Sequence, residues 1–473
     1  MTSELVSQSA TELAAHLRSG ALSSVEVMTA HLDRIDAING EVNAIVSRRD
    51  RQAVLDDAAR ADATDPQGRP LHGLQVAVKD LQNVAGLPTR AGSVVTPDVP
   101  AASDGIVGRR LRAAGAVIVG KTNVPEFGTG SHTFNEVFGV TRNPWDLSRS
   151  AGGSSGGAAA ALASRMVPIA DGSDLGGSLR NPAGFCNVVG FRPTIGLVPS
   201  AAERSTHLIR LGVEGPMGRS VADTALVLSA LAGPDARDPL SHLAAARDVA
   251  DPNLEAADLQ GVRIAWGGDL GLFTAERAVL DACRAALGTA AAMGAEVSDT
   301  HPDLTNAMHV FRVLRGLSYR DLGIQLGADA VTLLKATVRE NIAHGQTLTV
   351  DDVLTAERER AQLHVAMSDF FANFDLLALP TAQVVPFPTE LEYPHEIEGV
   401  VMNDYLEWMT TCCVITPTGC PAISIPAGFS PDGLPIGLQL VGPIGSDRRL
   451  LELAAAFETA LPHYHDVPPL TYR

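Results

Sequence analysis

The chain opens with two stretches whose hydrophobic residues follow helical spacing. Each stretch begins with a serine followed three residues later by a glutamate, the capping-box pattern (Ser9 with Glu12, and Ser23 with Glu26). Because glycine commonly closes a helix, we expect these helices to end at Gly20 and Gly40. The pattern therefore predicts an N-terminal helical layer within residues 1–60.

Further along, short apolar runs predict buried strands that alternate with helices. The first run, residues 74–80, ends in Lys79 and Asp80, and polar residues at a strand end usually face a cleft. The other predicted elements are a helix at 104–114, a strand at 115–120, a strand at 262–266, a helix at 275–293 and a strand at 375–380. Such alternation is typical of a largely parallel sheet.

We therefore expect a single large α/β domain over residues 1–473, with a mixed, mostly parallel sheet covered by helices on both faces. A length of 473 residues suits one large domain as well as two, but no internal repeat or low-complexity linker divides the sequence. The composition, 45% hydrophobic and 19% charged, is that of a globular protein.

Charge and targeting signals narrow the class of protein. A formal net charge of −18 would repel phosphate backbones, and no block rich in lysine or arginine offsets it, so we expect no nucleic-acid partner. The N-terminus lacks a signal-peptide pattern, and no run approaches the roughly 18 apolar residues that span a membrane. We expect a cytoplasmic protein with no membrane partner.

The cysteines and one nucleotide-binding motif are weak evidence for a function. The five cysteines are scattered without the spacing of a disulfide framework or a zinc site, and buried inert thiols are commoner than a reactive Cys413. Residues 115–122 match the phosphate-loop pattern GxxxxGK[ST]. However, the four middle residues, Ala-Val-Ile-Val, form an apolar strand-like run, whereas a phosphate cradle needs an open loop.

Two glycine-serine segments are the best candidates for chemistry. In residues 150–157, four glycines surround Ser154 and Ser155 just before an alanine-rich helix at 158–165. A flexible linker is the alternative, but linkers repeat and extend, whereas this segment stops at a helix. In residues 171–186, paired glycines precede Ser178, so backbone N–H groups could approach a reacting group without obstruction by Cβ atoms.

A nucleophilic serine needs a base, and neither segment contains histidine. His132 is the nearest histidine, but Lys79 is the better candidate, because burial can lower the pKa of a lysine enough to make it neutral. Side chains alternate along a strand, so Lys79 and Asp80 should face opposite sides. A solvated strand end is the ordinary alternative for a lysine in this place.

Together these segments resemble the amidase signature family, and the resemblance spans nearly the whole chain. The central match covers about residues 72–200. The matching segments are 74–80, 86–93, 152–157, 172–183, 190–194, 215–223, 419–426 and 433–439.

The resemblance implies the amidase signature fold and a Ser-Ser-Lys catalytic triad. Ser178 would be the acylated nucleophile, Ser154 the bridging serine behind a cis peptide bond, and Lys79 the base that drives both. The oxyanion would be held by four backbone N–H groups (Leu175, Gly176, Gly177 and Ser178). The resemblance implies no metal and no cofactor.

Some residues depart from the family pattern without removing a catalytic atom. Ser173 stands where threonine is common, Leu175 where threonine or isoleucine is frequent, and Asn181 where an apolar residue or glutamine is usual. Asp174 and Arg180 are expected to form a buried structural pair.

The substrate pocket is expected in three segments, 127–134, 200–211 and 384–408. The predicted substrate-binding residues are Phe127, Gly128, Thr129, Gly130 and Ser131. Aromatic residues such as Phe134, Tyr393 and Trp408 suit an apolar acyl or aryl group, although core packing would explain them equally well.

The implied function is hydrolysis of a small-molecule carboxylic amide, aryl or small aliphatic, with esters and carbamates as further substrates. The family also contains the glutaminase subunit of a tRNA-dependent amidotransferase, which works only with protein partners. The segment 175–181 is not the usual glutaminase version, which favours a free-standing hydrolase. A homodimer is a guess from the family alone.

Overall fold

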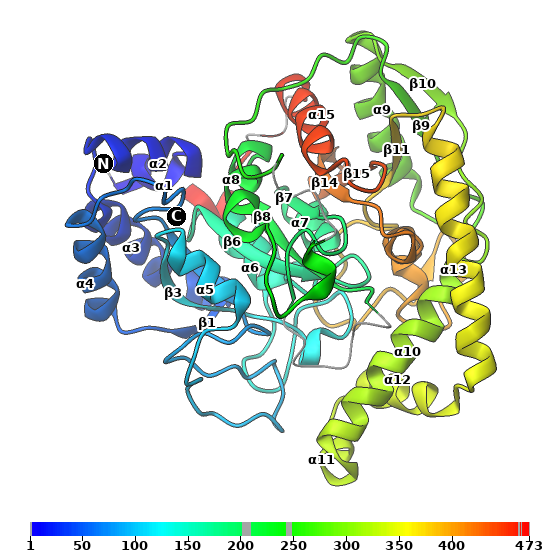
Figure 1. Cartoon of the computed structure of the whole chain (residues 1–473), viewed down its shortest axis with the longest axis horizontal. Coiled ribbons are helices and arrows are strands. Elements are labelled where there is room, and N and C mark those ends of the chain that lie inside the picture. The colour runs from blue at the N-terminus through cyan, green and yellow to red at the C-terminus, as the bar shows by residue number, and fades with distance from the viewer. Residues whose placement is uncertain (1, 201–209, 243–247, 462–463, 465, 473) are drawn as a thin grey trace.

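A large mixed sheet crosses the computed structural model, which describes residues 2–200, 210–242, 248–461, 464 and 466–472 (Figure 1). Within these residues, eleven strands follow the order β1-β3-β2-β6-β8-β7-β14-β15-β11-β9-β10. Their bounds are β1 (Ile45–Arg48), β2 (Gln75–Lys79), β3 (Val117–Thr122), β6 (Ile169–Asp174), β7 (Val189–Arg192), β8 (Val213–Gly218), β9 (Arg263–Trp266), β10 (Glu296–Asp299), β11 (Leu376–Pro380), β14 (Ala422–Phe429) and β15 (Pro435–Val441). Two small hairpins lie outside this sheet, β4 (Arg142–Asn143) with β5 (Asp146–Ser150), and β12 (Glu396–Ile397) with β13 (Val400–Val401).

The mixed sheet was predicted, but the excess of parallel pairs was not found. Among the described strands, four neighbouring pairs are parallel (β3–β2, β2–β6, β11–β9 and β9–β10). The other six neighbouring pairs are antiparallel. The strand-helix alternation that suggested a parallel sheet covers only the two outer parts of the sheet. In between, β14 and β15 are joined by the short turn 430–434, and a short connection allows only antiparallel pairing.

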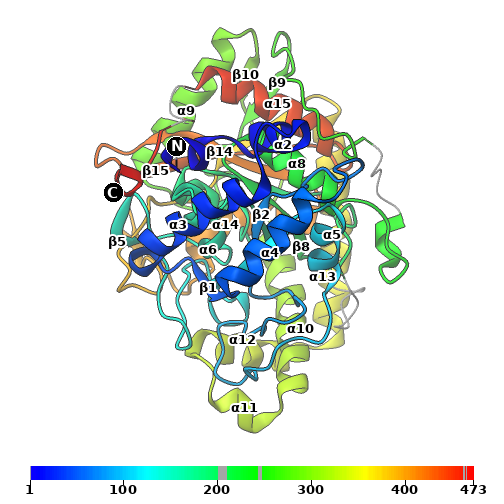
Figure 2. The same ribbon diagram turned by 90° about the vertical axis from the view of Figure 1, so that its left-hand side faces the viewer.

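Helices cover both faces of the sheet, as predicted. Side chains alternate along β2, so its residues contribute to a core on each face of the sheet. Val76 and Val78 belong to the core beneath α2, α5, α8, α9 and α15. Ala77 belongs to the core on the other face, beneath α3, α4 and α6. Figure 2 shows α3 and α4 on the near side of the sheet. The bounds are α1 (Thr2–Ser7), α2 (Ala10–Ser19), α3 (Ser24–Val42), α4 (Arg51–Asp62), α5 (Ile106–Ala113), α6 (Gly156–Ala163), α7 (Arg180–Cys186), α8 (Val221–Leu231), α9 (Arg277–Ala292), α10 (Ala307–Leu326), α11 (Ala328–Thr332), α12 (Ala336–Thr347), α13 (Val350–Phe371), α14 (Thr410–Cys413) and α15 (Asp447–Ala460). In the described part of the chain, no helix is both long and apolar enough to cross a bilayer.

The N-terminal helices begin where the capping boxes predicted. Both boxes are formed, and Gly20 closes α2 with a φ of 72°. The prediction that Gly40 closes the next helix is wrong, because α3 continues to Val42. Asn43, with a φ of 56°, ends it instead. Asparagine tolerates this left-handed conformation better than other residues with a side chain.

The helical arm formed by α10, α11, α12 and α13 has no counterpart in the sequence prediction (Figure 1). Its two inner helices meet at glycines, since a Cβ on Gly345 of α12 would lie 2.1 Å from the carbonyl oxygen of Gly316 of α10. The absence of these side chains lets the two backbones approach closely. A further apolar core, separate from the two on the faces of β2, packs beneath α10 and α13 and fixes α10 against the sheet.

Candidate active site

Lys79 is the last residue of β2, and its side chain is fully buried. Its Nζ lies among three hydroxyl groups, 2.9 Å from Ser154 Oγ, 2.8 Å from Ser155 Oγ and 2.9 Å from Ser173 Oγ. The lysine predicted as a base and the serine predicted as its partner are therefore in hydrogen-bond contact. The solvated alternative for Lys79 is wrong.

Asp80 faces the other side of the strand, as alternation predicts. There its carboxylate lies 3.2 Å from Nζ of Lys121, and both side chains are fully buried. Lys121 also donates to the carbonyl oxygen of Gln82 at 2.6 Å. The lysine of the phosphate-loop pattern thus lies in strand β3 and binds a carboxylate of its own chain, in accord with the rejection of that motif.

Ser154 follows a cis peptide bond after Gly153, as the family resemblance implies. Its side chain is only 3% exposed and reaches the cavity described below. Helix α6 begins two residues later, at Gly156. Gly157 in its first turn packs so closely that an added Cβ would lie 2.4 Å from the backbone nitrogen of Asn123. The glycines of this segment therefore serve close packing and do not form a linker.

Ser178 lies in the turn between β6 and α7 and also lines the cavity, with 8% of its surface exposed. Its carbonyl oxygen accepts a hydrogen bond from the backbone N–H of Ser155 at 3.2 Å. This contact ties the two glycine-serine segments together. Ser154 and Ser178 consequently open onto the same space.

Three of the four residues predicted to hold the oxyanion line the cavity and have backbone N–H groups that are unengaged in the described part of the chain. Leu175, Gly176 and Ser178 line the cavity, and their backbone N–H groups donate to no other described residue. Gly177 contradicts the prediction, because its N–H donates to the carboxylate of Asp174 at 2.9 Å. The N–H of Gly177 is thus already engaged by the protein, and Gly177 is not among the residues that line the cavity.

The predicted pair of Asp174 and Arg180 is present and includes a third residue, Arg192. The Asp174 carboxylate accepts two hydrogen bonds from Arg180 at 2.9 Å and one from Arg192 at 3.3 Å, and all three side chains are fully buried. Burial alone would raise the pKa of Asp174, but the charges of Arg180 and Arg192 lower it well below its usual value. The turn that carries Ser178 is thereby anchored by a charged group that stays ionised.

Electrostatics make Lys79 easier to deprotonate than a lysine in water. Burial lowers its pKa to about 8, against the nearby carboxyl groups of Glu214, Asp171 and Asp174, which raise it. Burial raises the pKa of Glu214 to about 7 and that of Asp171 to about 6. Asp171 accepts a hydrogen bond from the backbone N–H of Lys79 at 3.0 Å.

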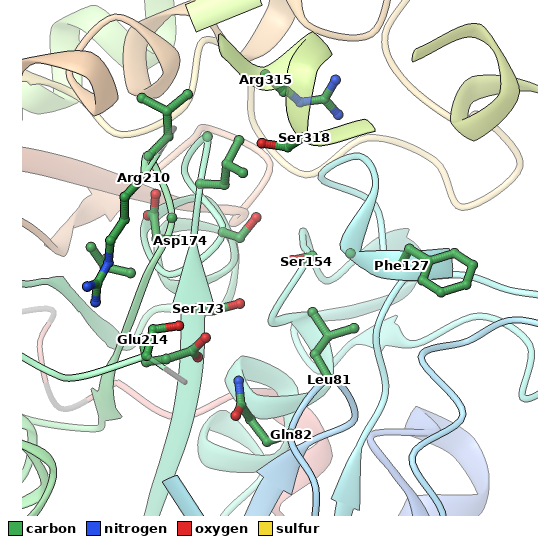
Figure 3. Close-up of a pocket in the computed structure, with 18 of the residues that line it drawn as sticks. Leu81, Gln82, Phe127, Ser154, Ser173, Asp174, Arg210, Glu214, Arg315 and Ser318 are labelled. Atoms are coloured by element: carbon green, nitrogen blue, oxygen red, sulfur yellow. The ribbon is translucent and has the colours of Figure 1, made fainter. Parts of the chain in front are cut away.

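The cavity has a volume of about 430 Å³ and lies at the carboxyl ends of β2 and β6 (Figure 3). Ligands in α/β proteins commonly bind at this edge of a sheet. Phe127, Gly128 and Gly130 from the predicted pocket set line the cavity. A Cβ on Gly128 would lie 3.4 Å from Ser154 Oγ, so this glycine leaves room directly beside the serine.

The other two members of that set, Thr129 and Ser131, do not line the cavity. Thr129 Oγ1 is 2.7 Å from the hydroxyl of Tyr319, and Ser131 Oγ donates to the carbonyl oxygen of Gly153 at 2.7 Å. These hydrogen bonds hold the two side chains within the protein and fix the loop in place.

The remaining predicted pocket segments are only partly correct. Ser200 and Leu211 line the cavity, while residues 201–209 lie outside the described residues. No residue of 384–408 is among those that line it. Trp408 belongs to the apolar core, with its ring 6.0 Å from that of Phe185.

Two features of the site were missed from the sequence. One wall of the cavity is formed by α10, whose contributing residues recur mostly at helical spacing (Phe311, Arg315, Ser318, Tyr319, Asp321, Leu322 and Gln325). The other is Glu214, opposite Ser173 in the pairing of β8 with β6. Only the helical spacing was visible in the sequence, and spacing alone does not separate a cavity wall from core packing.

The rejected nucleophile and base candidates have structural roles. His132 contacts the hydroxyl of Ser150 at 2.7 Å and the carbonyl oxygen of Thr389 at 3.1 Å, and burial lowers its pKa to about 4. All five cysteines are buried free thiols. Burial raises the pKa of Cys413, which makes its thiolate unavailable near neutral pH.

Known proteins resemble this chain in sequence and in fold. The family model described as Amidase matches residues 26–451. An acylamidase of Rhodococcus erythropolis is 37% identical over 96% of this chain and 95% of its own length. A glutamyl-tRNA(Gln) amidotransferase subunit of Nocardia farcinica is 34% identical over 97% of this chain and 99% of its own. The solved structure of a bacterial aryl acylamidase of the amidase signature family superimposes with a TM-score of 0.89 at 28% identity, covering 99% of both chains. The chain therefore belongs to the amidase signature family and is an amide-hydrolysing enzyme.

Proposed function

We propose that the enzyme cleaves acyl amides through an acyl-enzyme on Ser178. Neutral Lys79 takes the proton of Ser154, and Ser154 takes the proton of Ser178 as its Oγ attacks the amide carbonyl carbon. The observation that carries this proposal is the 2.9 Å contact between the buried Lys79 Nζ and Ser154 Oγ, beside the cavity that Ser178 lines.

The second half of the reaction uses the same groups in reverse. The protonated relay returns a proton to the leaving nitrogen, the amine departs, and water then attacks the ester carbonyl on Ser178. Backbone N–H groups of Leu175, Gly176 and Ser178 would hold the oxyanion in both steps. One such donor is typically worth about 3 kcal/mol of transition-state stabilisation.

The cavity supports an aryl or small aliphatic amide as substrate. Apolar side chains from six parts of the chain line it (Leu81, Ile106, Val107, Phe127, Leu175, Phe311, Leu322 and Met409). The acylamidase of Rhodococcus erythropolis and the aryl acylamidase structure point to the same class. Esters and carbamates present the same carbonyl group to Ser178, so they belong in the same set of test substrates.

The proposal is tested with purified wild-type protein and the Ser178→Ala variant on anilides, aliphatic amides, p-nitrophenyl esters, aryl carbamates and free glutamine. We expect wild type to release amine from anilides or aliphatic amides, and Ser178→Ala to lose turnover by a factor of about 10⁴ or more, because the nucleophile is gone. Ser229→Ala, a change on α8 outside the cavity, is the matched control. Full activity of Ser178→Ala would contradict the mechanism.

The second candidate is the glutaminase subunit of a tRNA-dependent amidotransferase. The relative in Nocardia farcinica, 34% identical over nearly its whole length, favours it. A glutaminase subunit would act on glutamine, and only with its partner subunits. Cleavage of glutamine alone in the panel above, or no activity until such partners are added, would select this candidate.

A further inference from the structure

Glu214 places a carboxyl group in the wall of the cavity that the proposed acyl transfer does not use. The residue belongs to β8 and stands opposite Ser173 of β6, the residue whose hydroxyl contacts Lys79. Cross-strand partners point to the same face of a sheet, so Glu214 and Ser173 share the cavity side. Figure 3 shows the Glu214 carboxyl group beside Ser173 and near the end of Gln82.

The hydrogen bonding of this carboxyl group is incomplete. Its Oε2 is shielded from solvent and has no hydrogen-bond partner among the described residues. Burial raises the pKa of Glu214 to about 7, while Lys79 and a hydrogen bond from the Gln82 side chain act in the opposite direction. Buried polar atoms are nearly always paired in native proteins, because an unpaired one is unfavourable.

The cationic side chains that line the cavity are engaged elsewhere. Arg210 forms two hydrogen bonds with the carboxylate of Asp238, at 2.8 and 2.6 Å. Arg315 is bound by the hydroxyl of Tyr319 at 3.0 Å, by Tyr405 and by Asn341. No described arginine or lysine forms an ion pair with Glu214. The cavity wall thus presents a carboxyl group whose charge is only partly compensated by the protein.

We propose that Glu214, with Gln82 beside it, forms a subsite for an amino group of the substrate. This inference rests on the proposed function and narrows its substrate class to amides that carry a protonated amine. An ammonium group in the cavity beside this carboxyl group would supply the positive charge that the protein provides only in part, and hydrogen bonds between ionised partners are the stronger kind. Such a site discriminates against an analogue that lacks the donor, because the carboxyl group is then left uncompensated.

The test compares pairs of amides that differ only in an ammonium or a methyl group at one position. One set carries this group on the acyl chain, as ω-aminoalkanoyl anilides with matching alkanoyl anilides. The other carries it at the end of a two-carbon chain on the aniline ring, so that it is an alkylammonium group. We measure the ratio of kcat/KM within each pair at about pH 9, where Glu214 is ionised and an alkylammonium group is still protonated.

For at least one pair we expect wild type to favour the ammonium substrate by roughly tenfold or more, and Glu214→Gln to reduce that ratio by about tenfold. Glu458→Gln is the matched control, because Glu458 is another half-buried glutamate whose pKa burial raises to about 7, and it does not line the cavity. Its ratio should equal that of wild type. If Glu214→Gln leaves the ratio of kcat/KM unchanged, the subsite is refuted. This holds even if kcat/KM falls for both substrates, because an equal fall for both would come from an effect of Glu214 on Lys79.

A binding measurement keeps this test independent of catalysis. Butylammonium should raise the melting temperature of wild type but not of Glu214→Gln, whereas 1-butanol should act equally on both. Glu214→Met provides a second variant without the carboxyl group if Glu214→Gln folds poorly. If wild type cleaves no amide yet shows this selective shift, the proposed function fails and the subsite stands. Equal shifts in wild type and variant would refute the subsite.

Discussion

At the scale of single residues, the proposed mechanism depends on whether Lys79 can lose its proton. Its Nζ is surrounded by hydroxyl groups that can accept or donate hydrogen bonds, so the contacts suit the neutral amine as well as the ammonium ion. Burial lowers the pKa of Lys79 to about 8 and therefore decides how much of the amine is neutral. A base with a pKa near the working pH is what general-base catalysis requires.

The pH dependence of kcat/KM follows from this pKa. Lys79 must be neutral to act, so kcat/KM for a neutral anilide should rise about tenfold per pH unit below pH 8 and level off above it. Lys79→Ala should lose nearly all activity near neutral pH, because no other group replaces the base. Initial rates of wild type across this pH range provide the measurement. A flat wild-type profile between pH 6 and about pH 9 would contradict the assignment of Lys79 as the base.

The properties of a single residue could be predicted where they depend only on its neighbours in the sequence. Lys79 and Asp80 were assigned to opposite faces because alternation along a strand is a local property. Gly177 was assigned wrongly because the direction of its N–H is set by how the Asp174 side chain folds back over the turn. Glu214 was missed because only the pairing of β8 with β6 brings it beside Ser173.

At the level of elements, glycines set how closely helices and strands approach the site. A Cβ on Gly157 would lie 2.4 Å from the nitrogen and 2.7 Å from the oxygen of Asn123, and these backbone atoms cannot move without shifting the strand end they follow. Gly288, in the exposed part of α9, has nothing within 4 Å of its added Cβ. Gly157 and Gly288 can therefore be compared by replacing each with alanine.

We expect Gly157→Ala to displace the start of α6 and Ser154 with it. A misplacement of about 1 Å can lower activity by roughly 100-fold, so kcat/KM should fall by at least this factor, and the melting temperature should also drop. Gly288→Ala should keep wild-type activity and gain up to about 1 kcal/mol of stability, because alanine favours a helix more than glycine does. Wild-type activity and melting temperature in Gly157→Ala would show that the packing at α6 is more tolerant than the structure indicates.

The elements themselves were predicted unevenly. Capping boxes and short apolar runs placed α2, α3, β2, β3 and β11 within a few residues, because their signals are contained in a few neighbouring positions. The antiparallel pairing of β14 and β15 was not predicted, because the sequence of one strand does not indicate which other strand it pairs with. For the same reason the sequence did not show that α10 forms a wall of the cavity.

At the level of the whole molecule, the net charge of −18 acts on any charged substrate. A negative protein attracts cations over long distances, and salt screens this attraction. For an ammonium-bearing amide, kcat/KM should therefore fall several-fold between about 0.01 M and about 0.5 M NaCl, while its methyl partner changes little. Rate measurements over this range check the prediction, and parallel curves for the two substrates would contradict it.

The anchoring of the nucleophile turn has a consequence for the timing of activity during synthesis of the chain. Arg180, which holds Asp174, also donates to Gln439 and to the carbonyl oxygen of Cys412, 259 and 232 residues further along the chain. A growing chain thus contains Lys79, Ser154 and Ser178 long before these acceptors have left the ribosome. Until then the guanidinium group of Arg180 lacks part of its hydrogen bonding, and the turn lacks its support. We expect the enzyme to become active only when translation is nearly complete, so that unfinished copies do not cleave amides in the cell.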